Sequence, residues 1–132
     1  MSQRRSVVIR IAVTLMVLDH LNNGVWALLN PRGYYRALPG EPGRDASDMT
    51  MVVIRDLGIA RLTLAALLIT AAVVLDRRVL LVAFGVASFA GVLRLVAHAA
   101  GDKGAEWFNW IGYGLGAAIP IGLAVLVWRR RL

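Results

Sequence analysis

The chain has 132 residues, of which 58% are hydrophobic and 17% are charged. Soluble domains carry about 25% charged residues, so this composition is typical of a membrane protein with a single domain. The absence of cysteine excludes disulfides, thiolate metal sites and a cysteine nucleophile. The net charge is +7, but the cations lie beside long apolar runs, which argues against nucleic acid as a partner.

Four apolar segments are long enough to cross the hydrocarbon core of a bilayer, which is about 30 Å thick and takes about 20 helical residues. They cover about residues 7–29, 53–75, 79–99 and 107–128. The sequence therefore predicts an all-α fold, an integral membrane four-helix bundle that forms one transmembrane domain over residues 1–132. The lipid bilayer is its first predicted partner.

Polar residues interrupt the second half of the first span, at Asp19, His20, Asn22 and Asn23, with Trp26 further along. Asp19 and the residues three, four and seven positions after it share one face of a helix. A charged side chain at the centre of a bilayer costs roughly 2.5–3.5 kcal/mol on insertion scales. This face is therefore expected to line the interior of the bundle.

The segment 30–51 between the first two spans contains three prolines and three glycines, which exclude a long helix. The adjacent rings of Tyr34 and Tyr35 prefer the level of the lipid headgroups. We therefore expect this segment to lie as a loop on the outer surface. It either caps the bundle or serves as a flexible polar linker.

Charged residues continue this pattern in the second and third spans. Arg55 and Asp56 lie at the mouth of the second span, and Arg61 lies about 12 Å from the start of the span near Val53. In the third span, Arg94 lies about 22 Å from the inner edge, and His98 follows one turn later.

The fourth span contributes Asn109 and Tyr113, which share a face one turn apart. The link at residues 76–78 is so short that the second and third spans must be antiparallel neighbours.

The cations are distributed unevenly between the two sides of the predicted bundle. The side that holds both termini and the second loop has eight cations and one acid: Arg4, Arg5, Arg10, Arg77, Arg78, Arg129, Arg130 and Arg131, with Asp76. Charges on the opposite side nearly cancel. The positive-inside rule then places both termini in the cytoplasm. Fourteen of the fifteen cations are arginine, a bias typical of high-GC bacteria, so we expect a bacterial plasma membrane.

Small residues recur at intervals that favour close helix packing in lipid. They are Gly112 and Gly116 in the fourth span, Gly85, Ser88 and Gly91 in the third, and Gly58, Ala65 and Ala66 in the second. We expect these faces to pack within the chain, with homo- or hetero-oligomerisation through the glycines as the alternative. Pro120 is expected to kink the fourth span and to free a carbonyl near Gly116.

The polar residues of all four spans fall in the outer half, whereas the inner halves are almost purely aliphatic. This asymmetry predicts one polar pocket toward the outer side. Its candidate ligand-binding residues are Asp19, His20, Asn23, Trp26, Asp56, Arg61, Arg94, His98, Asn109 and Tyr113. Asp19 is expected to neutralise Arg61 or Arg94, which leaves Asp56 for the other arginine.

Three interpretations of this pocket remain open. Buried ion pairs could serve only to fix the helix register. The arginines could instead hold an anionic or carbonyl oxygen of a lipid, a quinone or another amphipathic molecule. A catalytic site is the least favoured, because Asp19 and His20 diverge by about 100° on a helix and no metal-binding signature is present. No catalytic residue, metal or cofactor is assigned.

Short motifs extend across most of the chain. The first span ends in G-V-W-A-L-L-N-P at 24–31, the second opens with I-R-D-L-G at 54–58, and the third ends in R-L-V-A-H at 94–98. Together with Tyr34-Tyr35 and Pro39-Gly40, they resemble small four-helix membrane proteins of actinobacteria that have no assigned activity and are similar in layout to the DoxX-like group. Some DoxX-like proteins are membrane subunits of quinone-linked oxidoreductases. The resemblance implies a four-helix fold.

We expect a non-enzymatic integral membrane protein whose polar pocket binds a small amphipathic ligand or organises a partner complex. The first alternative is a membrane subunit of a quinone-linked oxidoreductase, with its redox centre on a partner protein. The second is a purely structural or assembly protein that uses its glycine faces.

Overall fold

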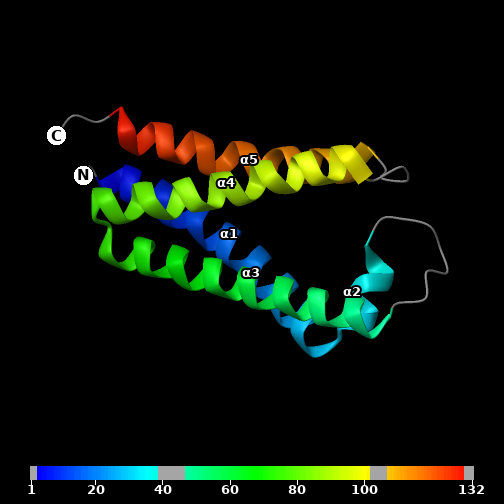
Figure 1. Cartoon of the computed structure of the whole chain (residues 1–132). Helices are drawn as coiled ribbons and strands as arrows, with labels where there is room; N and C mark the ends of the chain where they lie inside the picture. Colours follow the sequence, from blue (N-terminus) through cyan, green and yellow to red (C-terminus); the bar gives the residue numbers. More distant parts are fainter. Residues whose placement is uncertain (1–2, 39–46, 102–106, 130–132) are drawn as a thin grey trace.

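The computed structural model describes residues 3–38, 47–101 and 107–129, which are helical apart from short links (Figure 1). The five helices are α1 (Gln3–Leu29), α2 (Pro31–Ala37), α3 (Asp48–Val74), α4 (Arg77–Gly101) and α5 (Trp107–Trp128). All but α2 are long and apolar enough to cross a membrane, over residues 7–29, 48–74, 77–97 and 109–128. Within the described residues, the predicted all-α class and the four apolar spans are confirmed.

The long helices run between two ends of the molecule. The start of α1, the end of α5 and the link between α3 and α4 lie together at one end, which we call the terminal end (Figure 1). The opposite end, where α2 lies, is the α2 end. Helices α3 and α4 contact each other as the antiparallel neighbours that the short link predicted.

The link between α3 and α4 is made by two residues with defined roles. Leu75 ends α3 in the left-handed region, with φ 53°, and its N–H donates to the Ala71 carbonyl. Asp76 then caps α4, because its carboxylate accepts from the backbone N–H groups of Arg78 and Val79. These caps satisfy backbone groups that would otherwise lack partners at the two helix ends.

The segment 30–51 is more regular than its prolines and glycines indicated. Asn30 caps α2 by accepting from the Gly33 N–H, and Pro31 occupies the first turn, where no backbone donor is needed. Ser47 accepts from the Thr50 N–H, so α3 begins at Asp48 instead of near residue 53. Residues 39–46 lie outside the described residues.

The long helices form two close pairs, α1 with α3 and α4 with α5. In the first pair, a Cβ atom on Gly58 would lie 2.9 Å from the Gly24 carbonyl oxygen, and one on Gly24 would lie 3.0 Å from the Leu62 side chain. Ala27 and Ala65, which follow these glycines in α1 and α3, are fully buried. Small residues therefore let the two backbones approach closely, as is typical of helix crossings in lipid.

The second pair crosses at Gly91 and Gly116. A Cβ atom on Gly91 would lie 2.6 Å from the Gly116 carbonyl oxygen. Pro120, which is fully buried within α5, lacks the N–H that would otherwise bond to this oxygen. The carbonyl that Pro120 leaves free is therefore covered by the glycine backbone of the neighbouring helix.

Two glycines that we expected in packing faces, Gly85 and Gly112, have open space at the position of a side chain. Cβ atoms added to Gly85, Gly112 and Gly116 would meet nothing within 4 Å. The predicted internal packing is therefore confirmed for the Gly116 backbone, which meets Gly91, and is wrong for Gly112. Of the alanines expected with Gly58, Ala65 is buried and Ala66 is exposed.

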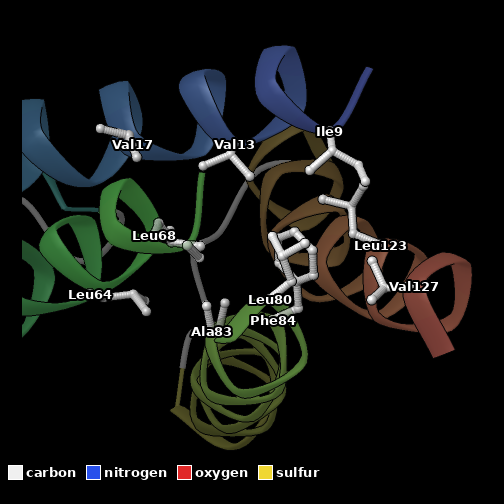
Figure 2. Packing of buried hydrophobic residues seen from close by; sticks show 12 residues of the cluster. Ile9, Val13, Val17, Leu64, Leu68, Leu80, Ala83, Phe84, Leu123 and Val127 are labelled. Atoms are coloured by element: carbon white, nitrogen blue, oxygen red, sulfur yellow. The ribbon is translucent and has the colours of Figure 1, made fainter. Parts of the chain in front are cut away.

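The hydrophobic core occupies the terminal half and holds the two pairs together (Figure 2). Phe84 and Leu80 of α4 lie at its centre, 0% and 1% exposed. Its other buried members are Ile9, Val13, Val17, Leu64, Leu68, Ala71, Ala83, Ala87, Leu123 and Val127. Toward the α2 end the two pairs diverge (Figure 1). The core therefore closes the terminal half, and the polar residues of the spans lie outside it.

Candidate functional site

Arg61 is the buried charged residue of the described chain, with 7% of its surface exposed. It lies thirteen residues after Asp48, the first residue of α3, which is about 20 Å along the helix axis. That position is near the middle of the 27-residue helix. A guanidinium buried at this level requires polar partners, because burying an unpaired charge is costly.

Asp19 of α1 is the acid that faces Arg61. Its Oδ2 lies 3.8 Å from Nη1 of Arg61, and its Oδ1 accepts from the Asn23 side-chain amide at 2.8 Å. The Asp19 side chain is nevertheless 60% exposed. Of the two partners expected for Asp19, Arg61 is therefore the one present, and Asn23 shares the helix face as predicted.

Tyr34 of α2 is a part of this cluster that the sequence did not indicate. It is 3% exposed, it packs against Ala27 and Ile54, and its ring meets Trp26 edge-on at 5.4 Å. The Tyr34 side chain also interacts electrostatically with the Arg61 guanidinium. The short helix α2 therefore folds Tyr34 against α1 and α3.

Some polar atoms of the cluster have no hydrogen-bond partner among the described residues. They are Nε and Nη1 of Arg61 and Nδ1 of His20, all of which are buried. The Asp19 contact at 3.8 Å is an ion pair that is longer than a hydrogen bond. Because a buried donor without a partner costs about 1–3 kcal/mol, the cluster has unused capacity to bind an acceptor.

A second polar group lies on the α4–α5 pair. The Arg94 guanidinium carbon is 5.4 Å from the centre of the Tyr113 ring, which is 8% exposed and meets Trp110 edge-on. Arg94 itself is exposed, and Asn109 is half-buried. Charge–charge interactions connect Arg94 to both Arg61 and His20. The first polar group therefore belongs to the α1–α3 pair and the second to the α4–α5 pair.

Other predicted site residues are not brought into the cluster. Asp56 is exposed on α3, and no ion pair joins it to Arg94, so the expected second pair is absent from the described residues. The His98 side chain lies outside the described part of the structure, so its role in the site stays a prediction. Within the described ranges, no three His, Asp or Glu side chains are grouped so that they could hold a metal ion.

A separate hollow of about 440 Å³ lies at the α2 end, between the α1–α2 junction and the start of α3. Arg32 and Arg55 contribute to its lining. The remaining lining residues are Leu29, Asn30, Pro31, Asp48, Met51 and Val52. None of them belongs to the Arg61 cluster.

Comparison of the chain with protein-family models, with characterised proteins and with solved structures finds no match. The resemblance to the DoxX-like layout stays a prediction. The functional argument therefore depends on the geometry of the cluster.

Proposed function

We propose that this chain is a multi-pass protein of the bacterial plasma membrane, with both termini in the cytoplasm, that binds a small amphipathic ligand without catalysing a reaction. The four long apolar helices support membrane insertion. The orientation is supported by the sequence, in which the two terminal segments and the link at 76–78 carry eight arginines and one acid, Asp76. Organising a partner complex is the alternative role for the same polar cluster.

The proposal depends on the burial of Arg61 and on its unpartnered nitrogens. It is buried at the middle of an apolar helix, and Nε and Nη1 of its guanidinium have no hydrogen-bond partner in the described chain. Ionisable groups within membrane helices are expensive and usually mark functional sites. An acceptor oxygen of a ligand would satisfy these donors and offset the cost of burial.

A purely structural ion pair explains the cluster less well. An arginine that serves only to fix helix register gains most from a short, bidentate contact with a carboxylate. Here the contact is 3.8 Å, and Asp19 is 60% exposed and shares its carboxylate with Asn23. The partner of Arg61 is therefore incomplete in the chain alone.

The proposal is tested by native mass spectrometry of the protein purified in a mild neutral detergent. We expect a small molecule retained at one copy per chain, and its loss in Arg94→Leu, which changes an exposed residue and leaves the core intact. Arg55→Leu is the matched control, because it removes an arginine of the same helix as Arg61 outside the cluster. A folded wild-type protein that retains no molecule, or retention unchanged in Arg94→Leu, would contradict the proposal.

A further inference from the structure

The hollow of about 440 Å³ at the α2 end brings together two arginines from different helices. Arg32 is the second residue of α2 and Arg55 belongs to α3, and both line the hollow. Among the described residues, neither arginine forms an ion pair or a side-chain hydrogen bond. Ligand pockets have volumes of about 300–1,000 Å³, so the hollow is large enough for a small polar group that would accept from both guanidinium groups.

The local structure places both arginines at the hollow. On the α3 side, the lining residues are Asp48 and those three, four and seven positions after it, which share one face of a helix. On the other side, the chain turns from α1 into α2 at Asn30, whose side-chain oxygen accepts from the Gly33 N–H. This cap fixes the first turn of α2, which contains Arg32, and α2 contacts α3.

The hollow lies where two apolar spans end. Leu29 is the last residue of the first candidate span, and Asp48 is the first residue of the second. In a membrane, the headgroups lie just outside a hydrocarbon core about 30 Å thick. Arg55 lies seven residues after Asp48, about 10 Å along the helix axis, and a long arginine side chain extends toward the headgroups. Both guanidinium groups are therefore expected at the level of the lipid phosphates.

Exposed apolar side chains line the same hollow. Leu29 and Val52 are 77% and 50% exposed. Acyl chains that cover them would gain hydrophobic free energy, whereas a free inorganic anion would not. The hollow therefore offers more to an anionic group that carries hydrocarbon chains than to the same anion in solution.

The charges that line the hollow favour a singly charged anion. The two arginines, Arg32 and Arg55, and the single acid, Asp48, give a formal charge of +1. A phosphodiester carries one negative charge and would bring the hollow to neutrality. Its free oxygens accept hydrogen bonds from guanidinium groups, whose forked donors match the geometry of a phosphate.

We propose that this hollow binds the phosphodiester headgroup of a phospholipid, which Arg32 and Arg55 hold while its acyl chains lie beside Leu29 and Val52. The site is separate from the Arg61 cluster, and of the proposed function it rests only on membrane insertion. Loss of one guanidinium is expected to weaken binding about tenfold, which corresponds to about 1.4 kcal/mol.

The test titrates the full chain in neutral detergent with phosphatidylglycerol, with diacylglycerol of the same acyl chains and with inorganic phosphate, followed by native mass spectrometry. We expect one saturable phosphatidylglycerol per chain, and binding at least about tenfold weaker for the other two probes. Arg32→Gln and Arg55→Gln should each weaken phosphatidylglycerol binding about tenfold. Arg36→Gln is the matched control, because Arg36 is an exposed arginine of α2 that does not line the hollow.

The contrary outcomes are distinct. Diacylglycerol that binds as tightly as phosphatidylglycerol would show that the phosphate is not recognised, and inorganic phosphate that binds as tightly would show that the lipid is not. Equal weakening by Arg36→Gln would leave only general attraction to surface arginines. Unchanged binding in Arg32→Gln and Arg55→Gln would also overturn the site.

The proposed function is judged by a different molecule, the one that Arg94→Leu removes. A folded protein that retains that molecule but binds no phosphatidylglycerol in a saturable way overturns the phospholipid site alone. Saturable phosphatidylglycerol that depends on Arg55, with no molecule that depends on Arg94, overturns the proposed function of the Arg61 cluster alone.

Discussion

Nη1 of Arg61 lies 3.8 Å from Oδ2 of Asp19, yet the arginine is 7% exposed and the aspartate is 60% exposed. The two partners therefore differ in what their removal leaves behind. Loss of Asp19 leaves a buried charge without its counter-ion, whereas loss of Arg61 leaves a carboxylate that is already accessible. The pair should respond asymmetrically to substitution.

Asp19→Asn is expected to destabilise the protein by about 1–3 kcal/mol, because it leaves the Arg61 guanidinium buried and unpaired. In an Arg61→Met background, which removes that charge but keeps much of the side-chain volume, Asp19→Asn should cost little. Unfolding of the four variants by SDS, followed by circular dichroism, measures this cycle. Equal destabilisation by Asp19→Asn in both backgrounds would show that the ion pair contributes nothing.

Gly91→Ala is expected to destabilise the α4–α5 pair by about 1–3 kcal/mol, since its Cβ would lie 2.6 Å from the Gly116 carbonyl oxygen and force the helices apart. Gly85→Ala on the same helix is the matched control, because its Cβ would meet nothing within 4 Å. Alanine there should be neutral or stabilising by up to about 1 kcal/mol through helix propensity. Thermal unfolding in detergent compares the two, and equal midpoints would refute the close crossing.

Leu75 adopts φ 53° in the described structure, a conformation that costs an L-residue about 1–2 kcal/mol. Leu75→Gly should therefore be more stable than Leu75→Ala by about 1 kcal/mol, because both remove the side chain but only glycine relieves the strain. Leu75→Val should be the least stable of the three, since a β-branched residue tolerates this region poorly. Unfolding midpoints that rank alanine above glycine would be inconsistent with the left-handed cap.

The absence of native cysteine makes the orientation directly measurable. Arg36→Cys in α2 should react with a membrane-impermeant maleimide in intact cells, whereas Arg78→Cys in α4 should react only after the cells are permeabilised. Both positions are exposed, so burial does not explain a difference between them. The reverse pattern would invert the proposed topology, and labelling of both in intact cells would argue against membrane insertion.

Apolar run length was sufficient to predict the four long helices, because only a helix of that length satisfies its backbone in an apolar segment. The α2 helix was not predicted, because the prolines and glycines of residues 30–51 argue against a long helix and α2 has only 7 residues. Asn30 followed by Pro31 is a capping signal that could have indicated it.

The pairing within the candidate site was harder to predict. The sequence allowed Asp19 to pair with either Arg61 or Arg94. Which of the two it contacts depends on where α1 crosses α3. Gly24 and Gly58 determine that crossing. Because Gly24 directly follows Asn22 and Asn23, the sequence does not distinguish it from the polar residues before it. The burial of Tyr34 depends on the same crossing and on how α2 folds back, neither of which can be inferred from residue spacing along one helix.

The arrangement of the pairs also bears on how the chain is made. Every residue of the Gly24–Gly58 crossing lies before the Leu75–Asp76 link, and every residue of the Gly91–Gly116 crossing lies after it. The first pair can therefore assemble while the ribosome is still translating α4 and α5. Among the described residues, the Phe84 core joins both halves of the chain, so its contacts form only after α4 and α5 have been made.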